Sequence, residues 1–400
     1  MPRRHHASRI VMFAIAFGLV AFALASASPP SSQLTGGRLL VNSYDAIFDA
    51  QFDHVPVLLT RACSPPPTQR TSRSDLAPPE ACELLEVVST WWQIQLDPNN
   101  RAHDEAFLTK ADASIAAIEA WTVREPSRAE AWFYLGGAYG ARAQWKVLRG
   151  ERLSAARDGK RIKDALERGL TLDPSLQDAY FGIGLYHYYA AVAPTAARVL
   201  RWLLLLPGGD RVQGLQEMLR ARDGGQLLRS EADYQLHLIY LWYEKEPGRA
   251  LDLLQGLHAR HPHNPHFLQR IAEIEDIYLH DTAASLRSWQ QLLADAEAAK
   301  VAEPGLAEVA ARLGLARQLD KRLESNAAIK QLREVIALKP TAPVGALARA
   351  QLQLGEVLDH QGRRSDAIEA YRAALDNVPA GDPDRIAPAA RERLRSSSRR

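Results

Sequence analysis

The sequence predicts an all-α fold, a right-handed α-solenoid in which helical hairpins stack on one another. The clearest hairpin is the stretch from Ala348 to Pro379. Apolar residues recur every three to four positions in each half of this stretch, which is the spacing of an amphipathic helix. Gly362 separates the two halves, and Pro379 ends the second one. Because diverged copies of the stretch can be laid out along most of the chain, we expect a stack of such hairpins.

Small residues in this hairpin mark the points where its two helices would cross, since helices approach closely only where side chains are short. The pattern resembles the tetratricopeptide repeat (TPR), a helix-turn-helix unit of about 34 residues. With Ala348 as position 1, the matches to positions 8, 15, 20, 24, 27 and 32 of that repeat are Gly355, Gly362, Ala367, Tyr371, Ala374 and Pro379. Gln351 stands where the family has an aromatic residue at position 4.

A second good match begins at Ala129, but its closing residue, Pro174, arrives 14 residues late for a standard repeat. Two extra turns on each helix would absorb about 14 residues. We therefore expect an elongated hairpin over residues 129–172. Its tip, between Ala141 and Lys163, is rich in lysine and arginine. This tip either meets an acidic partner or anionic head groups, or is simply a solvated helix end.

The same pattern divides the rest of the chain. We expect a signal peptide over residues 1–27, a linker over 28–37, and an N-terminal and central TPR-like solenoid over 38–298. A C-terminal pair of TPR units would follow over 299–380, and a capping helix with a flexible tail over 381–400.

The first residues have the features of an export signal. Three arginines precede an apolar run from Ile10 to Ala25, and small residues follow it. The run has 16 residues, fewer than the ~20 that a membrane-spanning helix needs, so cleavage after Ala27 is the preferred interpretation and a permanent anchor the alternative. Loss of the leader removes three arginines and no acidic residue, which changes the net charge from +2 to −1. Net charge therefore gives no reason to expect a nucleic-acid partner.

The chain has two cysteines, Cys63 and Cys82, on either side of a loop rich in proline and serine. In an exported protein they would meet an oxidising compartment, so we predict that they form a disulfide. Two free, buried thiols are the alternative.

Residues from Ala129 to Pro262 carry a second resemblance. The segments Phe181–Leu185, Leu203–Pro207 and Gly208–Arg211 are similar to part of a eukaryotic TPR family, the fungal inclusion-body-clearance proteins of the mitochondrial outer membrane and their animal relatives. The resemblance implies a repeat scaffold without catalytic residues. The export signal differs from that family's cytosolic and mitochondrial setting.

No motif of a common catalytic or cofactor site is present in the sequence: it lacks GxxxxGK[ST], HExxH, GxSxG and a strand-linked GxGxxG. We therefore predict a protein that is not an enzyme and binds no cofactor or small-molecule substrate. Three histidines within residues 261–266 could ligate zinc or nickel. The same segment reads as a turn between helices, with Pro262 ending one, Asn264 capping the next and Pro265 opening it. On that preferred interpretation the histidines are exposed and no metal is bound.

The TPR resemblance implies where a protein or peptide partner would bind. In such arrays, positions 2, 5, 9, 12 and 13 of each repeat commonly face the ligand. The aromatic residues at these positions here are Tyr188, Tyr189, Trp242, Tyr243, Phe133 and Phe181. Aromatic anchors supply much of the energy of protein interfaces. Packing of these rings against the neighbouring repeat is the alternative.

Together these features predict a non-catalytic protein-interaction scaffold in the periplasm or cell envelope of a bacterium. The alternative is a membrane-associated structural component, held by an uncleaved leader or by the apolar region Leu200–Leu206, with the basic hairpin tip on anionic lipid.

Overall fold

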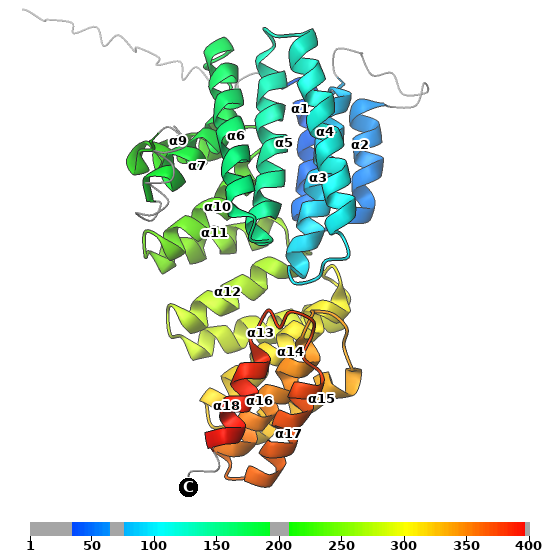
Figure 1. The fold of residues 1–400 in the computed structure, drawn as a ribbon, viewed down its shortest axis with the longest axis vertical. Helices are drawn as coiled ribbons and strands as arrows, with labels where there is room; N and C mark the ends of the chain where they lie inside the picture. Colours follow the sequence, from blue (N-terminus) through cyan, green and yellow to red (C-terminus); the bar gives the residue numbers. More distant parts are fainter. Residues whose placement is uncertain (1–33, 65–75, 193–207, 397–400) are drawn as a thin grey trace, which may run out of the picture. The chain divides into compact units, whose positions relative to one another are not determined.

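The structure is built from helices joined by short turns (Figure 1). The computed structural model describes residues 34–64, 76–192 and 208–396, and within these ranges every regular element is helical. The N-terminal helices are α1 (Gly37–Phe48), α2 (Val55–Cys63), α3 (Pro79–Leu96) and α4 (Asp104–Arg124). The next are α5 (Ala129–Leu148), α6 (Arg152–Leu172), α7 (Ala179–Val192) and α9 (Arg211–Gly224).

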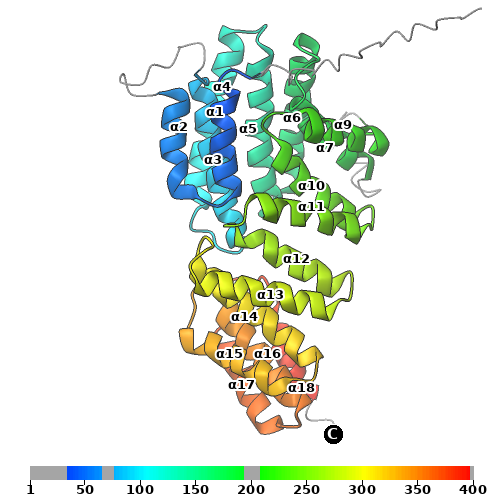
Figure 2. The same cartoon turned by 180° about the vertical axis from the view of Figure 1, so that it is seen from behind.

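The second half of the chain continues in the same manner. Its helices are α10 (Arg229–Trp242), α11 (Pro247–Arg260), α12 (Pro265–Ile277), α13 (Thr282–Glu297), α14 (Pro304–Lys321), α15 (Ser325–Leu338), α16 (Ala346–His360), α17 (Arg364–Asp376) and α18 (Ile386–Ser396). Each helix packs against the next one in the chain, and α10 to α17 form successive antiparallel hairpins (Figure 2). The fold is thus the predicted α-solenoid of TPR-like helical hairpins.

Glycines allow the closest helix crossings, as the small-residue pattern predicts. In the hairpin of α16 and α17, a Cβ atom at Gly355 would lie 2.4 Å from the ring of Tyr371. In the hairpin of α5 and α6, a Cβ atom at Gly136 would lie 2.6 Å from Leu166. The latter helices occupy the range in which we expect an elongated hairpin.

The turns of the last four hairpins share one backbone feature. The residue two positions before the second helix has a positive φ, with values of 58°, 55°, 62° and 74° at Lys245, His280, Leu323 and Gly362. Only glycine adopts this conformation without strain. At Leu323 the strained residue is also 88% exposed, although it is apolar.

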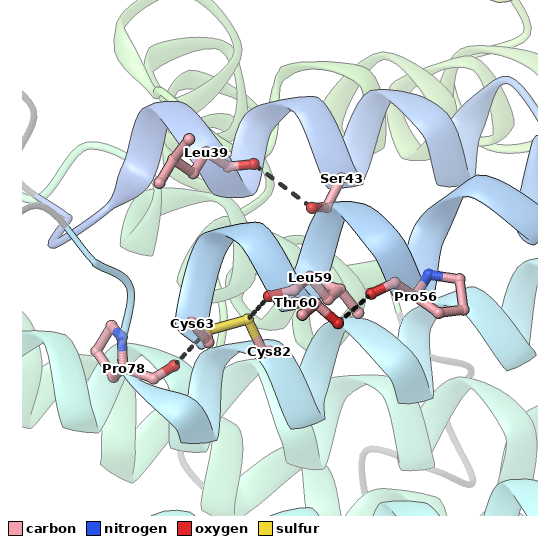
Figure 3. Close-up of a disulfide and its surroundings, with 8 residues drawn as sticks. All are labelled: Leu39, Ser43, Pro56, Leu59, Thr60, Cys63, Pro78 and Cys82. Carbon is pink, nitrogen blue, oxygen red and sulfur yellow. Dashed lines mark hydrogen bonds between the residues drawn. A yellow bond between two sulfur atoms is a disulfide. The ribbon is translucent and has the colours of Figure 1, made fainter. Parts of the chain in front are cut away.

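The N-terminal hairpins are joined by a disulfide. Cys63 at the end of α2 is bonded to Cys82 in α3, with Cα atoms 6.5 Å apart, in agreement with the predicted pairing (Figure 3). The loop between them is described only at its two ends, since residues 65–75 lie outside the described ranges.

Two other sequence predictions fall outside the described ranges. These are the leader at residues 1–27, with most of the linker that follows it, and the apolar stretch within residues 193–207. Among the helices of the described ranges, none is both long enough and apolar enough to cross a bilayer.

The N-terminal helices also contact the middle of the solenoid, 187 to 216 positions further along the chain. Asn264, at the start of α12, donates a 2.7 Å hydrogen bond to the carbonyl of Phe48, and the main-chain N–H of His263 donates to Asp49 at 3.0 Å. The hydroxyl of Tyr44 lies 3.4 Å from the carboxylate of Glu231 in α10. Figures 1 and 2 both show the end of α3 beside the start of α12.

Candidate functional site

Four of the six predicted binding residues lie near the ends of α7 and α10. Tyr188 and Tyr189 of α7 and Tyr243 after α10 form a triangle of rings, with centroids 5.5 to 5.9 Å apart and planes at 75° to 88°. Such edge-to-face contacts are favourable between aromatic rings. We call these three residues and the adjacent Trp242 the aromatic cluster.

The cluster has a buried floor and an open side. Tyr188 is fully buried, whereas Trp242 and Tyr243 are 56% and 43% exposed. The exposed pair lies where α10 leaves the core, because the residues of α10 from Ser230 to Leu241 are almost all buried. The open side therefore offers Trp242 and Tyr243, of which Tyr243 is held by its contacts with the two tyrosines of α7.

The two carboxylates beside the aromatic cluster are already paired. The hydroxyl of Tyr188 donates a hydrogen bond to the carboxylate of Glu244, and Arg211 donates to the same carboxylate from its Nε at 2.7 Å. The Arg211 guanidinium holds the pKa of Glu244 below its usual range. Arg249 pairs with Glu246 at 2.9 Å. Both carboxylates are thus neutralised, and the exposed Lys245 stands between them in the turn.

The two remaining predicted residues are not on the surface. Phe133 and Phe181 are buried in the core, where Phe133 contacts the ring of Tyr134 at 5.0 Å and Phe181 packs with Ala221 and Ala232. These two rings thus pack inside the solenoid, which was the alternative to binding a partner.

The side of α10 that carries Tyr234 and Gln235 is covered by the chain itself, and Gln235 stands at position 5, where a ligand is expected. Tyr234 contacts Trp92 of α3 at 4.9 Å between ring centroids, and Gln235 donates a hydrogen bond to Gln144 of α5 at 3.4 Å. With the contact of Tyr44 to Glu231, three N-terminal helices lie against α10. The large apolar side chains that remain exposed at α10 are Trp242 at its end and Tyr243 just after it.

Sequence reasoning missed further exposed apolar residues at the neighbouring hairpin turns. Ile277 ends α12, Tyr278 and Leu279 follow it, and Leu323 follows α14; all four are exposed. They lie just before or at the positive-φ residue of their turns, as Trp242 and Tyr243 do. The signal was available in the sequence as apolar residues where a hairpin turn is usually polar.

The histidines of residues 261–266 correct another expectation. His261 and His266 are buried rather than exposed, and their Nε2 atoms lie 2.9 Å from Ser230 Oγ and 3.0 Å from the Tyr234 hydroxyl. Only His263 is at the surface, where its Nδ1 lies 2.7 Å from Asp49. Burial lowers the pKa of His261 to about 4. The predicted turn is present, but the prediction that its histidines are exposed is wrong for His261 and His266, because the N-terminal helices cover this turn.

In the part of the chain that the structure describes, no group of three or more His, Cys, Asp or Glu side chains could hold a metal ion. The capping role predicted for Asn264 is met, because its side chain accepts a hydrogen bond from the main-chain N–H of His266 at 3.0 Å.

Much of the positive charge at the elongated hairpin tip is neutralised by ion pairs within the protein. The buried carboxylate of Asp158 accepts from Arg142 at 2.8 Å and from Lys146 at 2.7 Å. Arg149 pairs with Asp104 of α4 at 2.7 Å. Fewer free cations therefore remain for an acidic partner or a lipid surface than the sequence suggests.

Comparisons with known proteins find no matching family model and no matching curated protein. Solved structures do match. The APC/C hetero-tetramer Cut9–Hcn1 is 14% identical, with a TM-score of 0.42 over 88% of this chain and 63% of that chain. NprR in complex with its cognate peptide NprX is 10% identical, with a TM-score of 0.39 over 89% and 82%. The human IFIT1 dimer with m7Gppp-AAAA is 12% identical, with a TM-score of 0.45 over 92% and 83%.

This chain thus spans less than two thirds of the first of these structures. At identities of 10% to 14%, the similarities carry no information about individual site residues or function.

Proposed function

We propose that this chain is a non-catalytic protein-interaction scaffold of the bacterial cell envelope, which captures a partner segment on the aromatic cluster. The observation that carries the proposal is the exposure of Trp242 and Tyr243, with the ring of Tyr243 packed on the buried ring of Tyr188. Exposed tryptophan and tyrosine side chains are the most frequent energetic anchors of protein interfaces.

The cluster is organised before any partner arrives. Tyr243 contacts both tyrosines of α7, and the hydrogen bond from Tyr188 to Glu244 ties the end of α7 to the turn after α10. Side chains that are already held lose little conformational entropy on binding, so more of the contact energy remains as affinity.

The partner that suits this surface is an uncharged peptide segment with apolar or aromatic side chains. Both carboxylates beside the cluster, those of Glu244 and Glu246, are neutralised by Arg211 and Arg249. A charged partner residue would have to compete with these pairs and would gain little from them.

The placement in the envelope rests on the leader predicted for residues 1–27. The bond between Cys63 and Cys82 supports it, because disulfides persist in oxidising compartments.

Selection from a random peptide library displayed on phage tests the binding site. We expect the full chain to select uncharged peptides rich in apolar and aromatic residues. Trp242→Ala with Tyr243→Ala should weaken the binding of these peptides at least tenfold, since each lost anchor costs about 1 to 2 kcal/mol. A matched control is Val123→Ala with Leu153→Ala, which removes exposed apolar side chains elsewhere. Equal binding by both double variants would exclude the aromatic cluster.

Fractionation of cells with N-terminal sequencing tests the location. A mature protein that begins at Ser28 in the soluble envelope fraction is the expected result. An intact leader in the membrane fraction would instead support the membrane-associated component.

A further inference from the structure

The contact between the N-terminal hairpins and α10–α12 is formed by aromatic rings and imidazoles. Phe48, at the end of α1, lies with its ring centroid 5.6 Å from His261. Trp92 of α3 lies 4.9 Å from Tyr234 and 6.3 Å from His266. All five side chains are buried, so water does not reach the two imidazoles.

A third buried imidazole, that of His237 in α10, lies close to this contact. Its ring lies 4.7 Å from that of Tyr234 on the same helix. The hydrogen-bonding partners of His261 and His266 are neutral: they are the hydroxyl groups of Ser230 and Tyr234 and, for His266, the main chain of Gln95 in α3. A proton taken up by either buried imidazole would therefore lack a carboxylate in direct contact.

The folded contact keeps these imidazoles uncharged. Burial lowers the pKa of His261 to about 4 and that of His237 to about 3. Burial also holds the pKa of His266 well below its usual range. Arg260 and Arg270 lower these values further, by repelling a second positive charge. Once the contact opens, water reaches the rings of His261 and His266, which lie against Phe48 and Trp92, and the ordinary pKa of about 6.5 applies to them.

The lowered pKa values make the closed contact less stable in acid than at neutral pH. Because the pKa in the closed contact lies below that in the open one, the stabilisation is fully present above pH 6.5. It is lost progressively as the pH falls toward the pKa of the closed state. At pH 5, each such imidazole favours opening by about 30-fold relative to pH 7.5.

Other charged groups face the same contact and limit this effect. Burial raises the pKa of Glu231, which lies against Tyr44. Protonation of this carboxyl in acid therefore favours the closed contact and opposes the effect of the histidines. Burial also raises the pKa of Asp45 on α1. Asp49 opposes the lowering of the pKa of His261. The remaining charges, those of Arg260 and Arg270, pair with Asp233 and Glu273.

We propose that this contact is an acid-sensitive lock, which holds α1 and α3 against α10 and α12 at neutral pH and releases them when His261 and His266 take up protons. Release uncovers the side of α10 that the N-terminal helices cover, and so enlarges the surface available to a partner. The inference is independent of the proposed binding at the aromatic cluster, which lies at the opposite end of α10.

The C-terminal hairpins provide an internal reference. In α14 to α17 the only histidine is His360, which is exposed and whose Nδ1 lies 2.9 Å from Asp320. This region has no buried imidazole, so acid should not loosen it at the pH that opens the lock.

Amide hydrogen exchange of the full chain, read by mass spectrometry at pH 7.5 and pH 5.0 and corrected for intrinsic exchange rates, tests the lock. We expect peptides from α1, α3, α10 and α12 to lose protection at least tenfold at pH 5.0, while those from α14 to α17 keep theirs. Unchanged protection in the first group would overturn the proposal. Equal loss in all helices would also overturn it, because that result indicates general acid unfolding.

Substitution separates the two histidines from other acid effects. His261→Gln with His266→Gln keeps polar side chains but removes both protonation sites, and should abolish most of the pH response. His360→Gln is the matched control and should leave the response intact. If the double variant does not fold, an NMR titration of the two imidazole rings in the unmodified chain tests the lock instead. Titration of both near pH 6.5 with α10 still protected would contradict the lock.

Discussion

The contact between the N-terminal hairpins and α10–α12 differs in composition from the C-terminal hairpins α14 to α17. In the C-terminal hairpins, small and aliphatic residues from neighbouring helices form the core, with Tyr371 as the only buried ring. In the N-terminal contact, the rings of Phe48 and Trp92 meet those of Tyr234 and His266 from helices far along the chain.

The difference shows what the repeat pattern specifies and what it leaves open. The small residues of a repeat fix how its two helices cross, as Gly355 does against Tyr371. The helix side that faces away from this crossing has no fixed partner. In α10 that side carries Glu231, Gln235 and Tyr234, and the chain's own N-terminal helices cover it. Packing within a repeat is therefore local, whereas the covering of its free side is long-range.

Phe48→Ala should produce the largest effect, because it removes the ring at the centre of the N-terminal contact. Loss of a fully buried phenylalanine costs about 3 to 5 kcal/mol. Hydrogen exchange should show loss of protection in α1, α10 and α12, with α14 to α17 unchanged. The exposed Val123 provides the control, since Val123→Ala should change stability by less than about 0.5 kcal/mol. Loss of protection in all helices would show that the two regions are not independent.

Removal of the disulfide should weaken the N-terminal region next most strongly. The bond closes a separation of 19 residues, which corresponds to about 3 kcal/mol. Chemical unfolding of the chain with Cys63→Ser and Cys82→Ser measures this loss. Addition of a reductant to the unmodified chain should have the same effect, and it should have none on the double variant.

Gly355→Val tests the other side of the comparison. The new side chain would overlap the ring of Tyr371, and such overpacking costs about 1 to 3 kcal/mol. The loss of protection should be confined to α16 and α17, as measured by hydrogen exchange. Gly248→Val is a suitable control, because a Cβ atom there meets nothing within 4 Å. Loosening of α1 and α10 by Gly355→Val would show that the regions are coupled.

Leu323→Gly should have the smallest effect, and in the opposite direction. Glycine relieves the positive φ at this turn, so we expect a stabilisation of about 1 kcal/mol in chemical unfolding. Gly362→Leu in the next turn is the matched reverse change and should destabilise by a similar amount. A loss of stability with Leu323→Gly would mean that the exposed leucine side chain contributes to the fold.

The sequence predicted the local features and missed the long-range ones. Gly355, Ala367 and Pro379 recur at set positions, so the helix crossing and the hairpin boundaries could be foreseen. The pairing of Cys63 with Cys82 followed from there being no other cysteine. These inferences involve residues that are close in sequence or few in number.

The contact of α1 and α3 with α10 and α12 could not be foreseen. Hydrophobic periodicity indicates which side of a helix is buried, but not which helix covers it. His261 and His266 were assigned to an exposed turn because prolines and Asn264 accounted for the local sequence. The positive charge of the hairpin tip was overestimated for the same reason, since the pair of Arg149 with Asp104 joins two different hairpins.

A double-mutant cycle between Phe48 and Phe267 tests the central claim most directly, namely that the N-terminal helices cover α10–α12. The two rings lie 6.3 Å apart across the contact. Chemical unfolding of Phe48→Leu, Phe267→Leu and the double variant should give a coupling energy of at least about 0.5 kcal/mol. A coupling of zero within error would mean that the rings do not meet, and would contradict the claim that the N-terminal helices cover α10–α12.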